Sequence, residues 1–159
     1  MGHVHAYDNN IICHCGKKGC LETEISGKAL CRKLSERLEK GENSILSISQ
    51  TGHVVRSETE IVKAALKEDP VAIELIEEAG MKLGLQLANL INIFNPQAIL
   101  IGGTLAKAGD YFLSPIELAV KRYSLRRVYQ GVHIKITAIE NPGITGACLL
   151  ALNRYLEKV

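Results

Sequence analysis

Aromatic residues are scarce in this sequence. Tryptophan is absent, and aromatic residues make up only 4% of the 159 residues. Proteins that bind single-stranded nucleic acid stack the bases on aromatic side chains, so this composition argues against such a platform.

Charge of one sign is not in excess either, because the 19 Lys and Arg residues nearly balance the 17 Asp and Glu residues, for a net charge of +2. A near-neutral chain is not typical of a general binder of nucleic acid or membrane surfaces, and the basic stretch "KRYSLRR" (121–127) is typical of a solvated helix end.

Long hydrophobic runs and a leader segment are also missing. The longest apolar stretch, "LGLQLANLINIF", is broken by polar residues and is too short to span a bilayer. The first ten residues, "MGHVHAYDNN", contain no apolar segment of the kind that signal peptides carry. We therefore expect a cytoplasmic protein without a membrane partner. With 47% hydrophobic and 23% charged residues, the chain is long enough for a single domain with its own core.

Cysteine is concentrated near the amino terminus. Three of the five cysteines fall within "CHCGKKGC", from Cys13 to Cys20. In a reducing compartment, clustered cysteines indicate metal ligands rather than disulfides, and the spacing is not the two-residue gap of a dithiol switch. Gly16 and Gly19 give the backbone the freedom that a tight loop needs. Three thiolates and one imidazole form a closed structural zinc site, so the stretch predicts three of four zinc ligands.

The fourth ligand is left open by the residues alone. His14 lies between Cys13 and Cys15, so its side chain is expected to point away from the ion. His3 and His5 are two residues apart and would share one face of an extended segment. The spacing favours neither of these two histidines.

The hydrophobic pattern predicts helices and strands in alternation, which indicates an α/β fold. Ser57 and Glu60 form the pattern of a capping box, and the later part of the long helix that ends near Phe94 is apolar nearly all round, which predicts burial. The run "AILIGG" (98–103) predicts a buried strand of a parallel sheet. The expected helices span about 26–40, 61–68, 70–94, 110–123 and 143–158, and the expected strands span 98–103 and 132–139.

Several stretches resemble the ROK family, whose name stands for repressors, open reading frames and sugar kinases. The initial "GH", the "CHCGKKGCLE" that follows and the later "SG" are similar to the family's zinc signature. The stretch "LINIFNPQAILIGGTLAKAGDYF" is similar to its second conserved region, and "NPGITGACLLAL" to its closing helix. The resemblance covers essentially the whole chain. It implies that residues 1–159 form a single carboxy-terminal lobe of an actin/hexokinase-like (ribonuclease H-like) fold, with a zinc-binding loop at 3–20.

The resemblance also implies the roles of individual residues. In the family, the His of "GH" and three cysteines hold a structural zinc ion. The matching positions here are His3, Cys13, Cys15 and Cys20. The family's histidine also touches a sugar hydroxyl, and a sugar-binding glutamate matches Glu22. A carboxylate there would also suit a helix amino terminus, but the surrounding motif favours the sugar-binding role. In kinase members the nucleotide lies beside a Gly-Gly pair, which matches Gly102 and Gly103.

Other family motifs are missing. No "DxGxT" phosphate loop and no helix-turn-helix with a basic face are visible, and the Glu of the family's "E-x-G-H" would fall before Met1. We therefore expect a fragment of a two-lobe protein that performs no phosphoryl transfer by itself.

Three functions are compatible with these motifs, and the third of them is a zinc-stabilised dimerisation lobe with a degraded pocket. The first is the sugar-sensing lobe of a transcriptional regulator, favoured by an overall similarity to amino-sugar repressors. The second is the carboxy-terminal lobe of an ATP-dependent sugar kinase, which would use ATP and Mg²⁺. The expected partners are a sugar or sugar phosphate, a second copy in a homodimer, and DNA only through an amino-terminal region absent from the chain.

Overall fold

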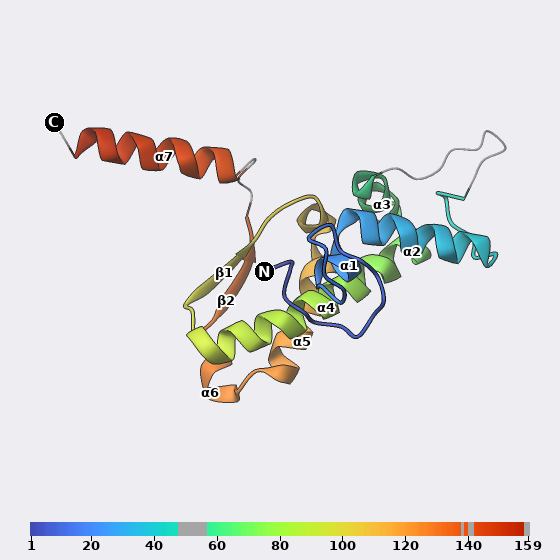
Figure 1. Ribbon diagram of the computed structural model, residues 1–159, viewed down its shortest axis with the longest axis horizontal. Helices are drawn as coiled ribbons and strands as arrows, with labels where there is room; N and C mark the ends of the chain where they lie inside the picture. Colours follow the sequence, from blue (N-terminus) through green and yellow to red (C-terminus); the bar gives the residue numbers. More distant parts are fainter. Residues whose placement is uncertain (48–56, 138, 140–141, 158–159) are drawn as a thin grey trace.

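The computed structural model describes residues 1–47, 57–137, 139 and 142–157 (Figure 1). Its helices are α1 (Glu22–Ile25), α2 (Gly27–Glu39), α3 (Glu58–Ala65), α4 (Pro70–Phe94), the 3₁₀ helix η1 (Leu105–Ala108), α5 (Asp110–Tyr123), α6 (Arg126–Tyr129) and α7 (Pro142–Leu156). Its strands are β1 (Ala98–Ile101) and β2 (His133–Ile136). This order agrees with the expected α/β fold. Residue 138 of the expected second strand and residue 158 of the expected last helix lie outside the described residues.

Local capping fixes the bounds of α2 and α4 where the sequence predicted them. The Ser26 side chain accepts a hydrogen bond from the backbone N–H of the third residue of α2 at 3.2 Å. Asp69 does the same for α4 at 2.8 Å, and Pro70 occupies the first turn, where its missing N–H costs no helical bond. Asn95 ends α4 in the left-handed conformation, with φ of 44°. The start of α3 differs: Ser57 is the N-cap residue, but its side chain makes no capping hydrogen bond, and its carbonyl oxygen accepts from Glu60 N–H at 3.2 Å.

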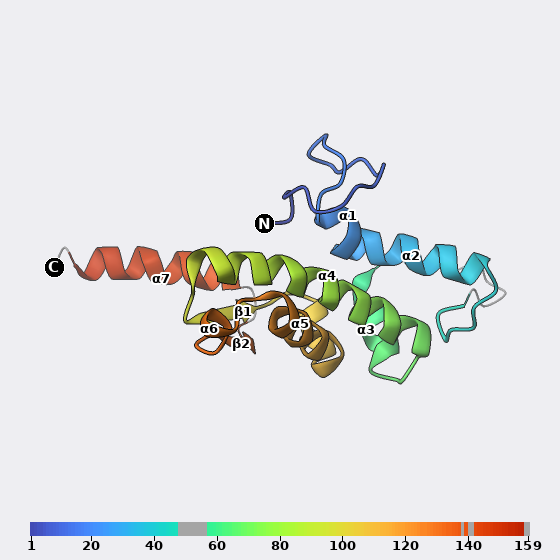
Figure 2. The same cartoon turned by 90° about the horizontal axis from the view of Figure 1, so that it is seen from below.

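The core lies where α4 crosses the other helices (Figure 2). The largest fully buried side chains of α2, α3, α4 and α5, which together form the helical body, are Leu30, Leu34, Ile61, Ile76, Ile91, Ile116 and Val120. The closest packing is between α4 and α5, where Gly84 of α4 faces the backbone of α5. A Cβ at Gly84 would lie 2.6 Å from the Ile116 carbonyl oxygen and 2.7 Å from Ala119 Cβ. Glycine therefore lets two helix backbones approach each other more closely than any side chain would allow.

This packing predicts opposite effects for two Gly→Ala substitutions. Gly84→Ala should lower the free energy of unfolding by about 1–3 kcal/mol, because the new methyl group overlaps backbone atoms of α5, which cannot rotate away as a side chain can. Gly146→Ala is the matched control: it lies within α7, and a Cβ there meets nothing within 4 Å. Since alanine favours the helix, that control should be neutral or stabilising by about 0.5–1 kcal/mol. Urea unfolding of both variants measures the difference, and equal effects would contradict the packing argument.

The sheet has two described strands, and it is more exposed than the sequence predicted. β1 and β2 pair in parallel, in register from Ala98 opposite His133 to Ile101 opposite Ile136 (Figure 1). The parallel pairing was expected, but the prediction of a buried strand is wrong, because only Ile101 of β1 is buried and Leu100 is 66% exposed. Exposed and less exposed positions alternate along both strands, so the described residues cover only one face of the pair.

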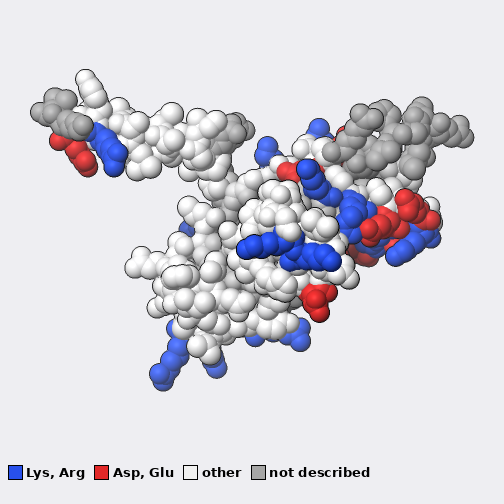
Figure 3. Space-filling model, viewed as in Figure 1, with Lys and Arg blue, Asp and Glu red and all other residues white. Residues whose placement is uncertain are grey.

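The ends of two helices show the same departure. The late part of α4 was expected to be buried all round, yet Ile93 is 71% exposed and Phe94 is 69% exposed. None of the residues of α7 is buried, and α7 extends away from the other helices in both views (Figures 1 and 2). Figure 3 shows that most of its surface is uncharged. Among the described residues, no helix is both long enough and apolar enough to cross a membrane.

Candidate metal and ligand site

Backbone hydrogen bonds hold the amino-terminal segment against the cysteine loop. The N–H of Ala6 donates to the Gly19 carbonyl oxygen at 2.8 Å, and Glu22 N–H donates to the Gly2 carbonyl oxygen at 2.9 Å. His5 and Cys20 form an isolated antiparallel bridge between these bonds. The expected extended segment is thus present as single bridges rather than as a regular strand. These contacts bring the first residues of the chain beside residues that follow about fifteen positions later.

Two glycines shape the loop itself. Gly16 has φ of 85° and Gly19 has φ of 71°, both in the left-handed region that glycine adopts without strain. A Cβ at Gly19 would lie 2.1 Å from the Tyr7 carbonyl oxygen, so no side chain fits there. Cys13 N–H donates to the Lys17 carbonyl oxygen at 2.8 Å, which closes the turn. The loop therefore folds back so that its cysteines face one another.

The loop brings four possible metal donors together. One side-chain donor atom from each of four residues lies within 4.8 Å of all the others: His3, Cys13, Cys15 and Cys20. Cys15 Sγ and Cys20 Sγ are 3.6 Å apart, and Cys13 Sγ is 3.5 Å from His3 Nδ1. Around a tetrahedral zinc ion with Zn–S bonds of about 2.3 Å, two sulfurs lie about 3.8 Å apart. The donor types and their spacing therefore fit a zinc ion, and His3 rather than His5 is the histidine of the cluster.

The cysteines of the cluster differ in their acidity. Burial, and after it hydrogen bonding to the neighbouring sulfurs, raises the pKa of the Cys20 thiol to about 11. The backbone N–H of Lys17 lowers the pKa of the exposed Cys15 thiol. Thiolates are the forms that bind metal, so binding of an ion must release the proton of Cys20. The metal affinity of the cluster should consequently weaken as the pH falls.

Glu22 lies beside the cluster, between two imidazole rings. Its Oε2 is 3.6 Å from His3 Nε2, and its Oε1 is 3.4 Å from His14 Nδ1. His14 was expected to point away from the ion, and it is not a member of the four-donor cluster, although its Nδ1 is 3.9 Å from Cys13 Sγ. The tight loop turns the His14 side chain toward the start of α1. A Cβ at Gly2 would be 2.8 Å from Glu22 Oε2, so Gly2 leaves room for this carboxylate.

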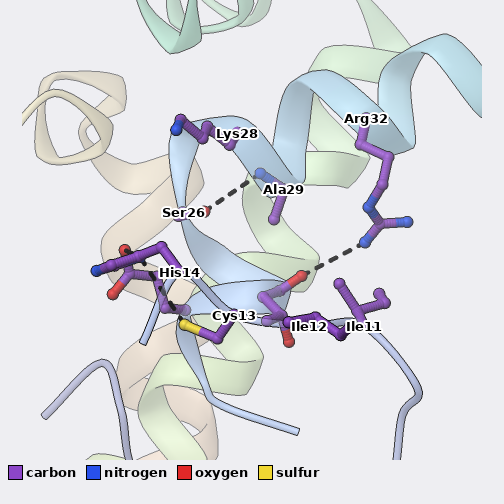
Figure 4. Close-up of a pocket in the computed structure, with 10 residues that line it drawn as sticks. Ile11, Ile12, Cys13, His14, Ser26, Lys28, Ala29 and Arg32 are labelled. Carbon is purple, nitrogen blue, oxygen red and sulfur yellow. Dashed lines mark hydrogen bonds and ion pairs between the residues drawn. The ribbon is translucent and has the colours of Figure 1, made fainter. Parts of the chain in front are cut away.

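A pocket of about 470 Å³ opens next to these groups (Figure 4). Cys13 and His14 lie on one side of it and Arg32 of α2 on the other (Figure 4). Its lining residues are Ile11, Ile12, Cys13, His14, Glu22, Thr23, Ser26, Lys28, Ala29 and Arg32. Of the two predicted sugar-binding residues, Glu22 lines the pocket and His3 does not. Gly102 and Gly103, which were predicted to lie beside a nucleotide, do not line it either. The contribution of α2 was missed, because nothing in the spacing of Lys28 or Arg32 relates them to the cysteine loop.

Glu24 anchors the same loop to the helical body. Its largely buried carboxylate accepts from Asn9 Nδ2 at 2.6 Å, pairs with Lys33 at 2.9 Å and also binds Lys82 of α4. Glu78 completes the cluster, with Lys33 at 2.9 Å and Lys82 at 2.7 Å. Burial alone would raise the pKa of Glu24, but the hydrogen bonds from Lys82 and Lys33 outweigh it and lower the pKa to about 2. The anchor is therefore ionised at neutral pH.

The family of the chain follows from its match to a family model. The model of the ROK family matches residues 1–154. The chain belongs to the ROK family. Its donor cluster lies within the matched region, as do Glu22 and the pocket.

ROK relatives of both kinds are similar to this chain. A glucokinase from Halalkalibacterium halodurans is 34% identical over 148 residues, covering 92% of this chain and 45% of the relative. The regulator NagC from Escherichia coli is 30% identical over 159 residues, covering all of this chain and 38% of the relative. This ROK chain thus spans less than half the length of the curated relatives that it matches.

A solved structure supports the fold. The crystal structure of a ROK-family transcriptional regulator, described as a homologue of the Escherichia coli Mlc protein, is 34% identical with a TM-score of 0.75. The match covers 85% of this ROK chain and 33% of that structure. The likeness agrees with the expected actin/hexokinase-like α/β fold.

Proposed function

We propose that this chain is the sugar-sensing, zinc-stabilised lobe of a ROK transcriptional regulator. One observation supports the proposal above all: a set of four zinc-type donors, His3, Cys13, Cys15 and Cys20, lies directly beside the carboxylate of Glu22. The likeness to a solved ROK regulator, at a TM-score of 0.75 and 34% identity, supports the regulatory role.

The proposed metal would act as a structural cross-link. His3 Nδ1 and the three sulfurs would hold the ion, and a bound zinc would tie the first residues of the chain to the loop. His3 then has only Nε2 free, and this atom faces Glu22 at 3.6 Å. The second ring nitrogen of a metal-bound histidine is an N–H group, and its dipole attracts the neighbouring carboxylate across this gap. Glu22 is thereby positioned without any contact of its own to the metal.

The proposed ligand is a sugar whose hydroxyls bind Glu22 and His3. A carboxylate accepts hydrogen bonds from hydroxyls, and the N–H of an imidazole donates to a hydroxyl oxygen. The Glu22 side chain is 33% exposed and lines the pocket, and the His3 side chain beside it is 48% exposed, so a ligand can reach both. Residues of a second lobe would add contacts to a sugar that this lobe already binds weakly by itself. That lobe, a homodimer, a cytoplasmic location and contact with DNA through an amino-terminal region also belong to this proposal.

A sugar kinase is the second candidate, and the 34% identity to a glucokinase favours it. In that case the chain would be the carboxy-terminal lobe of the enzyme, and Gly102 and Gly103 would lie beside a nucleotide. Gly103 has φ of 101°, with nothing within 4 Å of a Cβ, which leaves its backbone open to a ligand. Titration of the chain with an ATP analogue and Mg²⁺ separates the candidates: binding that Gly103→Val removes supports the kinase, and no binding supports the regulator.

The sugar-binding role predicts that Glu22→Gln weakens sugar binding about tenfold or more, because it removes a charged hydrogen-bond acceptor. Glucose and N-acetylglucosamine are suitable probes, and NMR titration of the labelled chain detects weak binding. The zinc content should stay unchanged, since Glu22 is not a member of the metal cluster. Glu39→Gln, on the exposed end of α2, is the matched control and should bind like the wild type. Equal affinities for both variants would contradict the assignment of Glu22.

A further inference from the structure

His14 has no role in the proposed function so far, although it lines the pocket. It lies in the loop between two cysteines of the cluster but is not a member of the four-donor set. Its side chain is 66% exposed, and its ring meets the ring of His3 edge to face, with centroids 4.7 Å apart and an interplanar angle of 78°. His14, His3 and Glu22 each offer one ligand atom within 4.8 Å of the others. These three side chains therefore form a polar group of their own, of which His14 and Glu22 line the pocket.

Each oxygen of Glu22 has its own imidazole neighbour. The two N···O distances, 3.4 Å to His14 and 3.6 Å to His3, are longer than those of direct hydrogen bonds, which are about 2.7–3.2 Å. A hydroxyl oxygen about 2.8 Å from both atoms of such a pair would close a triangle, donating to the carboxylate and accepting from the ring. The geometry thus provides two equivalent positions, side by side, for two hydroxyl groups.

We propose that His14 is a sugar-binding residue that makes Glu22 a two-hydroxyl site. One hydroxyl lies between His3 and Glu22 Oε2, and the adjacent hydroxyl lies between His14 and Glu22 Oε1. The ligand class is a sugar with two neighbouring hydroxyls on the same side of the pocket, because one carboxylate can accept from both at once. This inference rests on the proposed sugar-binding function.

A competing role for His14 is to support the metal cluster, since its Nδ1 is also 3.9 Å from Cys13 Sγ. That distance is longer than the one to Glu22, and the neighbouring Cys13 is buried while His14 is open to solvent. The two roles predict different losses. A ligand-binding His14 affects sugar affinity alone, whereas a metal-supporting His14 affects the zinc content as well.

The test uses His14→Phe, which keeps an aromatic ring against His3 and removes both ring nitrogens. The probes are glucose, mannose and N-acetylglucosamine, and then the monodeoxy analogues of whichever binds the wild-type chain best. We expect His14→Phe to lower the affinity for that sugar about tenfold with zinc content unchanged. The monodeoxy analogue that lacks the hydroxyl bound by His14 should bind the wild type as weakly as the full sugar binds His14→Phe. The affinity of that analogue should be the same for His14→Phe as for the wild type. Lys17→Ala, in the same loop but outside the pocket lining, is the matched control.

Three results would overturn the inference. If His14→Phe binds the sugar as tightly as the wild-type chain does, His14 is not a sugar-binding residue, and the proposed function stays intact. Loss of zinc in His14→Phe assigns the residue to the metal cluster. If His14→Phe lowers the affinity for every deoxy analogue by the same factor, His14 does not bind a particular hydroxyl. A wild-type chain that binds none of the probes would instead contradict the proposed function itself.

Discussion

Replacement of Cys15 by serine is expected to reduce bound zinc from one ion per chain to well under half an ion. The free energy of unfolding should fall by about 3 kcal/mol or more, because the binding energy of a structural zinc is part of the folding energy. Cys15 is the best position for this test because it is exposed, so the substitution removes a donor without leaving a cavity. Metal analysis by mass spectrometry and urea unfolding measure the two effects.

Cys148→Ser is the matched control for the metal prediction. Cys148 is also exposed, but it lies on α7 outside the four-donor cluster. Its replacement should leave both zinc content and stability unchanged. A wild-type chain purified without zinc, or a Cys15→Ser chain that keeps a full equivalent, would refute the proposed ligand set. Amide exchange should show loosening of the first 22 residues in Cys15→Ser and not in Cys148→Ser.

Replacement of Glu24 by glutamine is expected to lower the free energy of unfolding by about 3 kcal/mol. Removing one partner from a buried ion cluster leaves the others uncompensated. Lys33 and Lys82 each pair with Glu24 and with Glu78. In the variant, these two ammonium groups would share the single carboxylate of Glu78 out of the two. The hydrogen bond from Asn9 would also be weakened, because its acceptor would be a neutral amide oxygen instead of a carboxylate. Urea unfolding at neutral pH measures the loss.

The effect of Glu24→Gln should depend on pH in a defined direction. The pKa of Glu24 is lowered to about 2 in the folded chain from an ordinary value of 4.5. A lowered carboxyl pKa stabilises the fold above the unfolded value, and the contribution is lost as the pH falls through the folded value. The difference between wild type and Glu24→Gln should therefore be full at pH 7 and shrink progressively between about pH 4.5 and pH 2. Loss of metal in acid affects both chains and does not enter this difference.

Glu36→Gln provides the control for the ion cluster. Glu36 pairs with Arg32 at 2.7 Å on the exposed side of α2, with side-chain exposures of 50% and 37%. Exposed pairs contribute about 0–1 kcal/mol, so this variant should unfold almost like the wild type. A loss as large as that of Glu24→Gln would show that burial of the cluster does not govern its effect.

The sequence by itself determined the features that rest on neighbouring residues. The bounds of α2 and α4 follow from Ser26, Asp69 and Asn95, which act on the helix ends next to them. The loop from Cys13 to Cys20 closes on itself through glycines and short-range hydrogen bonds, so the meeting of its sulfurs is also local. Such contacts depend on spacing along the chain, which a sequence displays directly.

Only the tertiary structure decided which residues face one another across the fold. The sequence did not indicate that His14 turns toward Glu22, that Arg32 lines the same pocket, or that Lys82 reaches Glu24 from 58 positions away. It also predicted burial for β1 and for the end of α4, which the described residues do not provide. An apolar pattern indicates which side chains of a segment can be buried. They become buried only where elements from distant parts of the chain pack against the segment.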